Sequence, residues 1–160
     1  MSATFPEGPI EGVLVTPVKR FRDDRGWLME MFRVDELDAG VIPAMGYISE
    51  TRPGIQRGPH EHVDQADVFL FLGPGEFRVR MWDNRPKSPT YRNTMTVLAG
   101  ESHPTRVIVP AGVVHGYKNV GSVSALVYNF PNRLYKGKGR AEPVDEIRHE
   151  DDPASPFHMD

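Results

Sequence analysis

The chain has 160 residues, a net charge of −3 and no cysteine, so a disulfide framework, a thiolate zinc site and a cysteine nucleophile are excluded. This length suits one domain with its own core. The mild acidity argues against nucleic acid or a charged membrane as partner, since both favour a basic surface. No apolar run approaches the roughly 20 residues of a membrane span, and residues 1–11 lack signal-peptide features, so we expect a cytoplasmic protein.

Short apolar runs separated by frequent glycine and proline, 15 of each, are typical of a sandwich, jelly roll or small barrel. The predicted strands cover residues 12–21, 27–32, 46–51, 68–72, 77–82, 93–98, 105–109, 114–118 and 125–130. One short helix is predicted over residues 34–39, with Gly40 as its C-terminal cap. We therefore expect a single all-β domain over residues 1–160 with at most one or two short helices.

Three segments depart from simple alternation. The run Val-Phe-Leu-Phe-Leu over residues 68–72 is apolar on both faces, which predicts a strand covered by the barrel interior and by another layer or subunit. Residues 1–11 are polar and contain Pro and Gly, and form either a flexible segment or one that adds a strand to a partner's sheet. Residues 132–160 are rich in charge and proline, and form either a solvated tail or an ordered arm over a pocket.

Histidines provide the main chemical signal. His60 and His62 stand two apart in Arg-Gly-Pro-His-Glu-His, with Asp67 shortly after, so in a strand both rings share a face. Two imidazoles beside a carboxylate suit metal binding or acid–base chemistry, whereas surface histidines in a polar hairpin are the simpler alternative. His115 lies in Pro-Ala-Gly-Val-Val-His-Gly-Tyr-Lys-Asn, which has the spacing of the second cupin motif. The paired motifs predict a cupin-type barrel with these histidines meeting inside it.

Two further features admit both a functional and a structural interpretation. Arg25 and Glu30 flank a turn in Asp-Asp-Arg-Gly-Trp-Leu-Met-Glu, where Arg offers a planar fork for phosphate, but the segment also suits an ordinary polar hairpin. Tyr128 lies on the apolar strand 125–130, where a tyrosine most often belongs to the core.

Taken together, these residues resemble the dTDP-4-dehydrorhamnose 3,5-epimerase family. The resemblance runs from about residue 12 to residue 153 and depends on the strings FRDDRGWLMEMF, GIQRGPHEH, WDNRPKSPTY, VIVPAGVVHGY and DEIRHEDDP. That family consists of small cupin barrels, usually dimeric, that isomerise nucleotide-linked 4-keto-6-deoxy sugars on the route to dTDP-rhamnose and other carbohydrates. The resemblance therefore implies a homodimeric isomerase with a nucleotide-sugar substrate and no required cofactor.

The resemblance also implies catalytic roles. His60 corresponds to the general base, Tyr128 to the general acid, and Asp152 to the carboxylate that orients the base. A ketone at C4 acidifies the protons at C3 and C5, and a histidine near neutral pKa suits their removal. The residues implied in substrate binding are Arg25, Glu30 and Arg57 for the diphosphate and His115 for the sugar.

The sequence departs from the family pattern where the enolate forms. The family has Gln at the position of His62 and, at the position of Asp67, a lysine that helps to stabilise the enolate. Here His60, His62, Asp67 and His115 reproduce the three-His, one-carboxylate set of metal-binding cupins, which suits Fe(II), Mn(II), Ni(II) or Zn(II). A divalent ion would do the missing lysine's work as a Lewis acid. Three hypotheses therefore stay open: a sugar-nucleotide epimerase, a metal-dependent cupin enzyme of another class, and a non-catalytic nucleotide-sugar-binding module.

Overall fold

The computed structural model describes residues 4–160, and within them the chain forms twelve strands and four short 3-10 helices. The strands are β1 (Leu14–Pro17), β2 (Arg20–Asp23), β3 (Gly26–Met29), β4 (Tyr47–Thr51), β5 (Gln56–Glu61), β6 (Asp67–Phe71), β7 (Glu76–Asp83), β8 (Thr94–Gly100), β9 (Thr105–Val109), β10 (Val113–Asn119), β11 (Ala125–Asn129) and β12 (Ile147–Arg148). The 3-10 helices are η1 (Val34–Glu36), η2 (Ala39–Val41), η3 (Lys138–Arg140) and η4 (His149–Asp151). No helix in this described part is long and apolar enough to cross a membrane.

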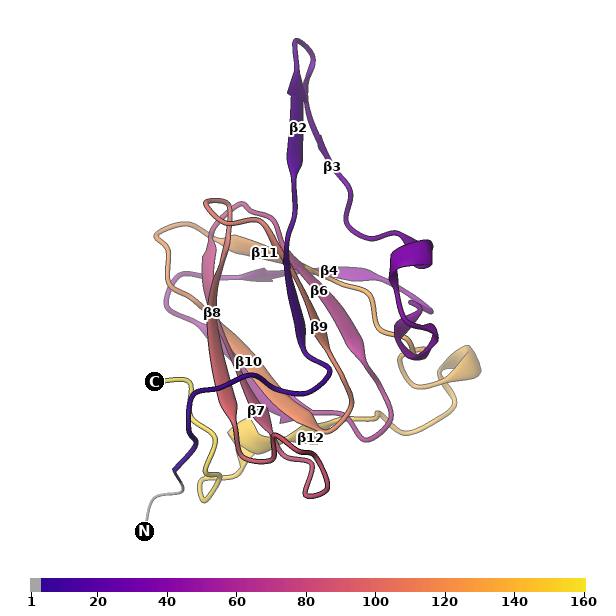
Figure 1. Ribbon diagram of the computed structural model, residues 1–160, viewed down its shortest axis with the longest axis vertical. Coiled ribbons are helices and arrows are strands. Elements are labelled where there is room, and N and C mark those ends of the chain that lie inside the picture. Colours follow the sequence, from indigo (N-terminus) through magenta and orange to yellow (C-terminus); the bar gives the residue numbers. More distant parts are fainter. Residues whose placement is uncertain (1–3) are drawn as a thin grey trace.

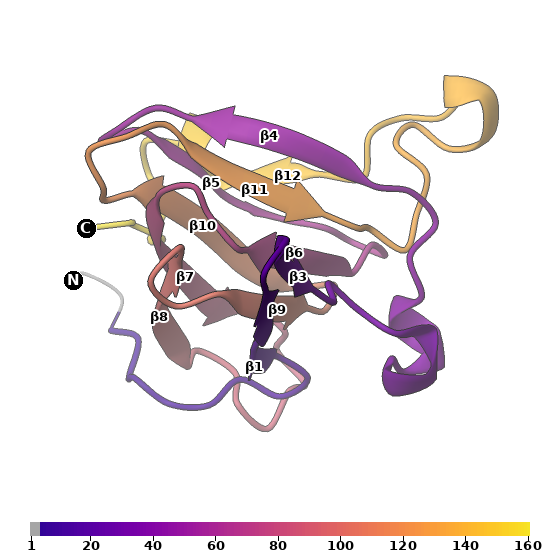
Figure 2. The ribbon, with the colours of Figure 1, turned by 90° about the horizontal axis from the view of Figure 1, so that it is seen from above.

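Two five-stranded antiparallel sheets face each other across the core (Figure 2). One has the order β1-β9-β6-β11-β4 and the other β12-β5-β10-β7-β8. Apolar side chains alternate inward from both sheets, with Phe71 and Val107 from the first meeting Phe77 and Val79 from the second. Phe71 is fully buried, so its replacement by alanine would cost about 3–5 kcal/mol. The predicted all-β cupin-type barrel is confirmed.

β6 is covered on both faces, as its apolar run predicts. Phe69 and Phe71 point into the barrel, while Val68 and Leu70 form a second cluster outside it. The covering layer comes from this same chain, because Met29, Leu37, Val41, Tyr128 and Phe130 pack on that outer face.

The predicted helix over residues 34–39 is wrong. The structure has η1 and η2 instead, and Gly40 lies inside η2 rather than capping a helix. A segment of this length cannot repay the cost of nucleating an α-helix. Its stability comes instead from Leu37 and Val41 packing on β6.

The predicted strand over residues 12–21 is two strands with different partners. β1 pairs with β9, with Val15 opposite Val107, whereas β2 pairs only with β3. The β2–β3 hairpin extends well away from the barrel (Figure 1). Phe21, Trp27 and Leu28 on it are each about half exposed, which is a large apolar surface for an isolated hairpin.

Both termini of the described chain pack on the barrel. Residues 1–3 lie outside the described part, but the flexible segment predicted up to residue 11 is otherwise wrong, because Ile10 is buried and Phe5 packs on Phe157 with ring centroids 5.4 Å apart. The C-terminal residues form the ordered arm rather than a solvated tail. Met159 is buried, and Arg80 Nη1 donates to the main-chain oxygen of Asp160 at 2.7 Å.

Candidate functional site

The two histidine motifs meet on neighbouring strands. β5 and β10 pair antiparallel with His60 directly opposite His115, and His62 follows just after the end of β5. The ring centroids of His60 and His115 are 4.6 Å apart, and those of His62 and His115 are 5.7 Å apart. The three residues offer donor nitrogens that lie within 4.8 Å of one another. The structure thus brings together the three histidines that the sequence singles out.

Two of the three rings are held by main-chain carbonyls. His62 Nδ1 contacts the main-chain oxygen of Asp145, and His115 Nδ1 lies 3.0 Å from the main-chain oxygen of Val113. A carbonyl oxygen can only accept, so in both rings Nδ1 carries a proton and Nε2 points toward the carboxylate of Asp67. The distances to Asp67 Oδ2 are 3.0 Å from His62 Nε2 and 3.5 Å from His115 Nε2.

Asp67 is the buried charge at the centre of this cluster, with a side chain only 1% exposed. Its Oδ1 accepts from the amide groups of Gln65 and Asn129, each at 2.9 Å. Burial by itself raises the pKa of Asp67, but the opposing effects of His62 and His115 are larger and lower the pKa to about 2. Conversely, burial lowers the pKa of His62, and Asp67 raises it to about 9. Asp67 and His62 therefore balance each other's charge beneath the cavity.

His60 differs from its two neighbours because no main-chain carbonyl holds its ring. Its Nδ1 lies 3.7 Å from Glu146 Oε1, and the ring lines the cavity described below. Burial, followed by the nearby His115 and His62, lowers the pKa of His60 to about 2. The ring is therefore neutral in the unliganded protein, and any protonated form of it would need a nearby negative charge such as Glu146.

His60, His62 and Glu146 line a cavity of about 1000 Å³, to which the C-terminal arm also contributes. Asp67 and His115 are buried and are not among its lining residues, so the contact with the sugar that the resemblance implies for His115 is not seen in this structure. Small-molecule sites commonly reach this size, and a mixed polar and aromatic lining is typical of them. The aromatic lining includes Tyr47, Tyr117 and Tyr135. The charged side chains around it are of both signs: Arg57, Arg133, Lys136, Arg140 and Arg148 on one hand, and Asp64, Glu142, Asp145, Glu146 and Glu150 on the other.

Tyr128 does not lie with His60, contrary to the role that the resemblance implies. It is on the outer face of β11 and packs with Val68 and Leu70. Side chains alternate along a strand, so the next residue, Asn129, faces inward and bonds Asp67. A resemblance in sequence does not show which face of the strand a side chain occupies. The structure supports the interpretation of Tyr128 as a packing residue.

Tyr47 is the inward tyrosine that sequence reasoning missed as a site residue. It lies opposite Asn129 on β4, lines the cavity, and accepts a hydrogen bond from Asn129 Nδ2 at 3.0 Å. Burial raises its pKa to about 12, so the hydroxyl keeps its proton. In the strand Tyr-Ile-Ser-Glu-Thr, the three residues with a hydroxyl group alternate with Ile and Glu, which predicts that the hydroxyls share one face. Only the strand pairing shows that this face is the inner one.

Asp152 is also not beside His60. It is exposed, and its Oδ1 accepts from the main-chain nitrogen of Ala154 at 2.9 Å within a turn. The carboxylate within ion-pair distance of His60 Nδ1 is that of Glu146, at 3.7 Å. β12 pairs with β5 and sets Arg148 opposite His60, and this pairing brings the nearby Glu146 to the ring. The acidic C-terminal string predicts a carboxylate in this arm, but the residue depends on a long-range register.

The three residues implied in diphosphate binding lie in different places. Arg57 lines the cavity, where Nη2 donates to the main-chain oxygen of Glu50 at 2.7 Å. Arg25 is at the tip of the projecting hairpin, paired with Asp23, and Glu30 borders a small separate pocket at the hairpin's base. A single chain therefore brings only Arg57 to the cavity.

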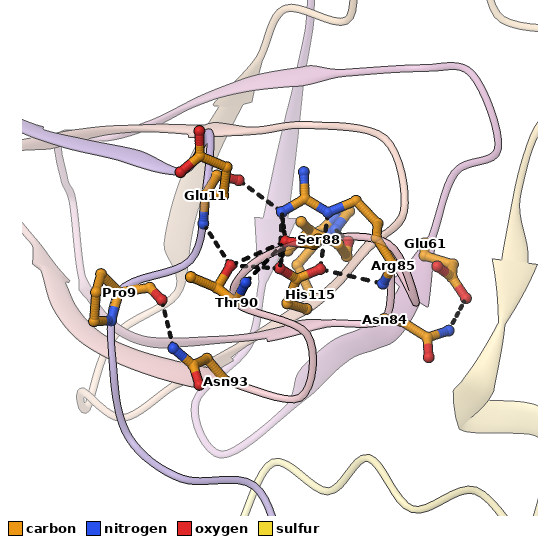
Figure 3. A network of polar contacts seen from close by, with 11 residues as sticks. Pro9, Glu11, Glu61, Asn84, Arg85, Ser88, Thr90, Asn93 and His115 are labelled. Carbon is orange, nitrogen blue, oxygen red and sulfur yellow. Dashed lines mark hydrogen bonds and ion pairs between the residues drawn. The ribbon is translucent and has the colours of Figure 1, made fainter.

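The loop between β7 and β8 supports the turn that leads to His115. Arg85, Ser88 and Thr90 all donate to the carboxylate of Asp83. Arg85 also donates to the main-chain oxygen of Glu11, and Thr90 Oγ1 accepts from its main-chain nitrogen (Figure 3). The same loop reaches the turn, because Asn84 N donates to the oxygen of Gly112 at 3.3 Å. Gly112 N in turn donates to the oxygen of His62 at 2.9 Å, which ties the two histidine motifs together.

The chain matches the dTDP-4-dehydrorhamnose 3,5-epimerase family over residues 7–152. It is 35% identical over 127 residues to a probable low-salt glycan biosynthesis epimerase, Agl13, of Haloferax volcanii, covering 79% of this chain and 81% of the relative. It is 31% identical over 128 residues to the spore coat polysaccharide biosynthesis protein SpsL of Bacillus subtilis, covering 79% and 82%. In fold it is similar to a dTDP sugar isomerase from Desulfovibrio desulfuricans, with a TM-score of 0.78, 24% identity and 93% and 91% coverage.

The protein is therefore an enzyme of the isomerase class, an epimerase related to proteins of glycan and polysaccharide biosynthesis. More particularly, the chain belongs to the dTDP-4-dehydrorhamnose 3,5-epimerase family. The recognition made from the sequence strings is confirmed, and the hypothesis of a non-catalytic binding module is set aside.

Proposed function

We propose that the protein epimerises a nucleotide-linked 4-keto-6-deoxy sugar by removing a proton from a carbon next to the keto group. The observation that carries this proposal is the position of the His60 ring, which lines the large cavity with Glu146 Oε1 3.7 Å from its Nδ1. A related fold supports the substrate class, because a Legionella pneumophila epimerase is described in complex with dTDP-4-keto-L-rhamnose, with a TM-score of 0.74, 20% identity and 91% and 76% coverage.

His60 is proposed as the general base. Nδ1 lies toward Glu146, which leaves Nε2 as the position that accepts the proton from C3 or C5. The imidazolium that forms is stabilised by the Glu146 carboxylate, in the way that an orienting carboxylate supports a catalytic histidine. A base positioned in this manner contributes about 10²–10⁴-fold to the rate of proton transfer.

Tyr47, rather than Tyr128, is proposed as the general acid. Asn129 already donates to the Tyr47 oxygen, so the tyrosine's own proton is free to point into the cavity. A group that keeps its proton at neutral pH can deliver it to the enolate from the side of β4. His60 lies on β5 in the opposite sheet, so the base and the acid come from two walls of the barrel.

The nucleotide diphosphate is proposed to bind where basic side chains gather at the cavity. Arg57, Arg133 and Arg140 all line it, and the guanidinium group forms paired bonds to phosphate oxygens. We further propose a homodimer, because the β2–β3 hairpin projects from its own barrel and exposes apolar side chains that a second copy of the chain would cover. Arg25 at the tip of the hairpin would then lie against that second copy. A cytoplasmic site of action stays a prediction.

The test is proton NMR of dTDP-4-keto-6-deoxyglucose incubated with the protein in deuterated water. Loss of the C3 or C5 proton signal is the expected result, and it identifies the centre that is epimerised. His60→Ala should slow the exchange at least a hundredfold, whereas the exposed His103→Ala should exchange at the wild-type rate. Wild-type protein that leaves both signals intact would contradict the proposal.

A further inference from the structure

We infer that His62, His115 and Asp67 bind one divalent transition-metal ion beneath the cavity and leave His60 free beside it. The inference deepens the proposed function: the role of the ion depends on that function, whereas its binding does not. It comes from three features of the cluster, namely the spacing of the donor atoms, their lack of other partners, and the way in which two of the three rings are anchored.

The donor atoms have the spacing of ligands that share an ion. Metal–nitrogen and metal–oxygen bonds of about 2.0–2.2 Å place neighbouring ligand atoms roughly 3.0–3.5 Å apart in octahedral or tetrahedral geometry. Asp67 Oδ2 lies 3.0 Å from His62 Nε2 and 3.5 Å from His115 Nε2. These distances suit the geometry before any side chain moves.

The same atoms lack hydrogen-bond partners. Within residues 4–160, Asp67 Oδ2 and His115 Nε2 are buried side-chain atoms without a hydrogen-bond partner, and Asp67 Oδ2 has only the ion-pair contacts with His62 and His115. His60 Nδ1 is a further such atom, but it lies on the side of Glu146. Each unpaired buried polar atom costs about 1–3 kcal/mol. Gln65 Nε2 does contact His62 Nε2, but at 3.3 Å it is a long contact, and the amide keeps its bond to Asp67.

The anchoring of the rings separates ligand from base. His62 and His115 each present Nδ1 to a main-chain carbonyl, so Nε2 is the atom left for the ion, and this is the second-shell arrangement of metal-binding histidines. On His62 the ion would displace the proton that Nε2 shares with Asp67. His60 has a carboxylate at 3.7 Å instead and faces the cavity. The inference therefore assigns two rings to the ion and keeps the third for the proton.

The donor set indicates which ions fit. Two imidazoles and one carboxylate suit Fe(II), Mn(II), Ni(II) or Zn(II), whereas Mg²⁺ and Ca²⁺ favour ligand sets made only of oxygen. When bound, such an ion would act as a Lewis acid toward the keto oxygen of the sugar, supplying the positive charge that an enolate requires.

The test is metal content by elemental analysis after the purified protein is loaded separately with Mn²⁺, Fe²⁺, Ni²⁺ and Zn²⁺ and dialysed. We expect about one equivalent of at least one ion in the wild type and less than a tenth of that in His62→Gln and Asp67→Asn. His60→Ala and His103→Ala should retain the wild-type content. Because a cavity at a buried site can unfold the protein, the melting temperature is measured alongside, and the ion should raise it in the wild type but not in His62→Gln.

Two results would overturn the inference: a wild type that binds none of the four ions, or a His60→Ala protein that loses the ion as completely as His62→Gln. Solvent exchange into the sugar separates this failure from that of the proposed function. If protein that binds no ion still exchanges the sugar protons, the proposed function stands and the metal site is wrong. If the protein binds one equivalent of an ion but exchanges no proton, the metal site stands and the proposed function is wrong.

Discussion

Asp83→Asn is the substitution whose effect follows most directly from the geometry, because the side chain is fully buried and both of its oxygens face only donors. Oδ1 accepts from Arg85 Nε at 2.8 Å, and Oδ2 accepts from the hydroxyls of Ser88 and Thr90, each at 2.6 Å. Arg85 donates to both oxygens, since its Nη2 also reaches Oδ2 at 2.9 Å, and a guanidinium cannot accept. The NH₂ group of an asparagine therefore meets a donor whichever way the amide is oriented.

The size of the loss can be worked out in two ways. These partners lower the pKa of Asp83 from 3.8 to about 2 even though burial opposes them, and a shift of this size corresponds to roughly 2 kcal/mol in favour of the ionised form. Breaking a buried ion pair by removing one partner costs about 3–5 kcal/mol. We therefore expect the free energy of unfolding to fall by roughly 2–4 kcal/mol at pH 7.

The assay is urea denaturation of the wild type and of Asp83→Asn at a series of pH values, with the exposed Asp24→Asn as control. A carboxyl whose pKa is lowered on folding stabilises above its unfolded value, and this stability is lost as pH falls through the folded value. The difference between wild type and Asp83→Asn should therefore be constant above pH 4 and shrink from pH 4 toward pH 2. A difference below about 0.5 kcal/mol at pH 7, or one that grows in acid, would refute the reasoning.

Three paired predictions concern the site and the hairpin. Tyr47→Phe should slow formation of the epimerised sugar, followed by NMR, by about 10²–10⁴-fold, because it removes the proposed acid, while Tyr128→Phe should stay within about twofold and equal rates would refute the assignment. Glu146→Gln should slow solvent exchange into the sugar at least tenfold through loss of the carboxylate beside His60, whereas Asp152→Asn, in a solvent-exposed turn, should not. Trp27→Ser should shift the proposed dimer toward monomer in sedimentation velocity at micromolar protein, and an unchanged sedimentation coefficient would remove the hairpin from the interface.

The fold could be predicted from the sequence because most strands carry a local apolar pattern. The run over residues 68–72 is the clearest case, since a strand without polar positions must be covered on both faces, and β6 is. β5 has no such pattern, since it reads Gln-Arg-Gly-Pro-His-Glu, and its place in the sheet is decided by pairing with β10. β5, which carries His60, is therefore a strand that local patterns miss, whereas β10, which carries His115, is predicted from its own run.

The site could be predicted only as far as its own motifs reach. His60 and His115 come from two motifs whose spacing fixes their strands, and they meet as expected. The roles of Tyr128 and Asp152 come from the family resemblance alone, and for each residue a feature that no local pattern contains decides where the side chain lies. For the tyrosine that feature is strand parity, and for the carboxylate it is the register of the short strand β12 against β5.

The position of Asp67 also explains how an acidic residue can stand where the family pattern has a lysine. In an open site its charge would repel the enolate, but the carboxylate is almost fully buried behind the rings of His62 and His115. Its charge is balanced there by a proton on His62 or, in our inference, by a divalent ion. In both cases a cationic partner of Asp67, rather than Asp67 itself, lies toward the cavity, since His62 lines it and Asp67 does not. Under the proposed function, this partner would supply the positive charge that enolate chemistry needs.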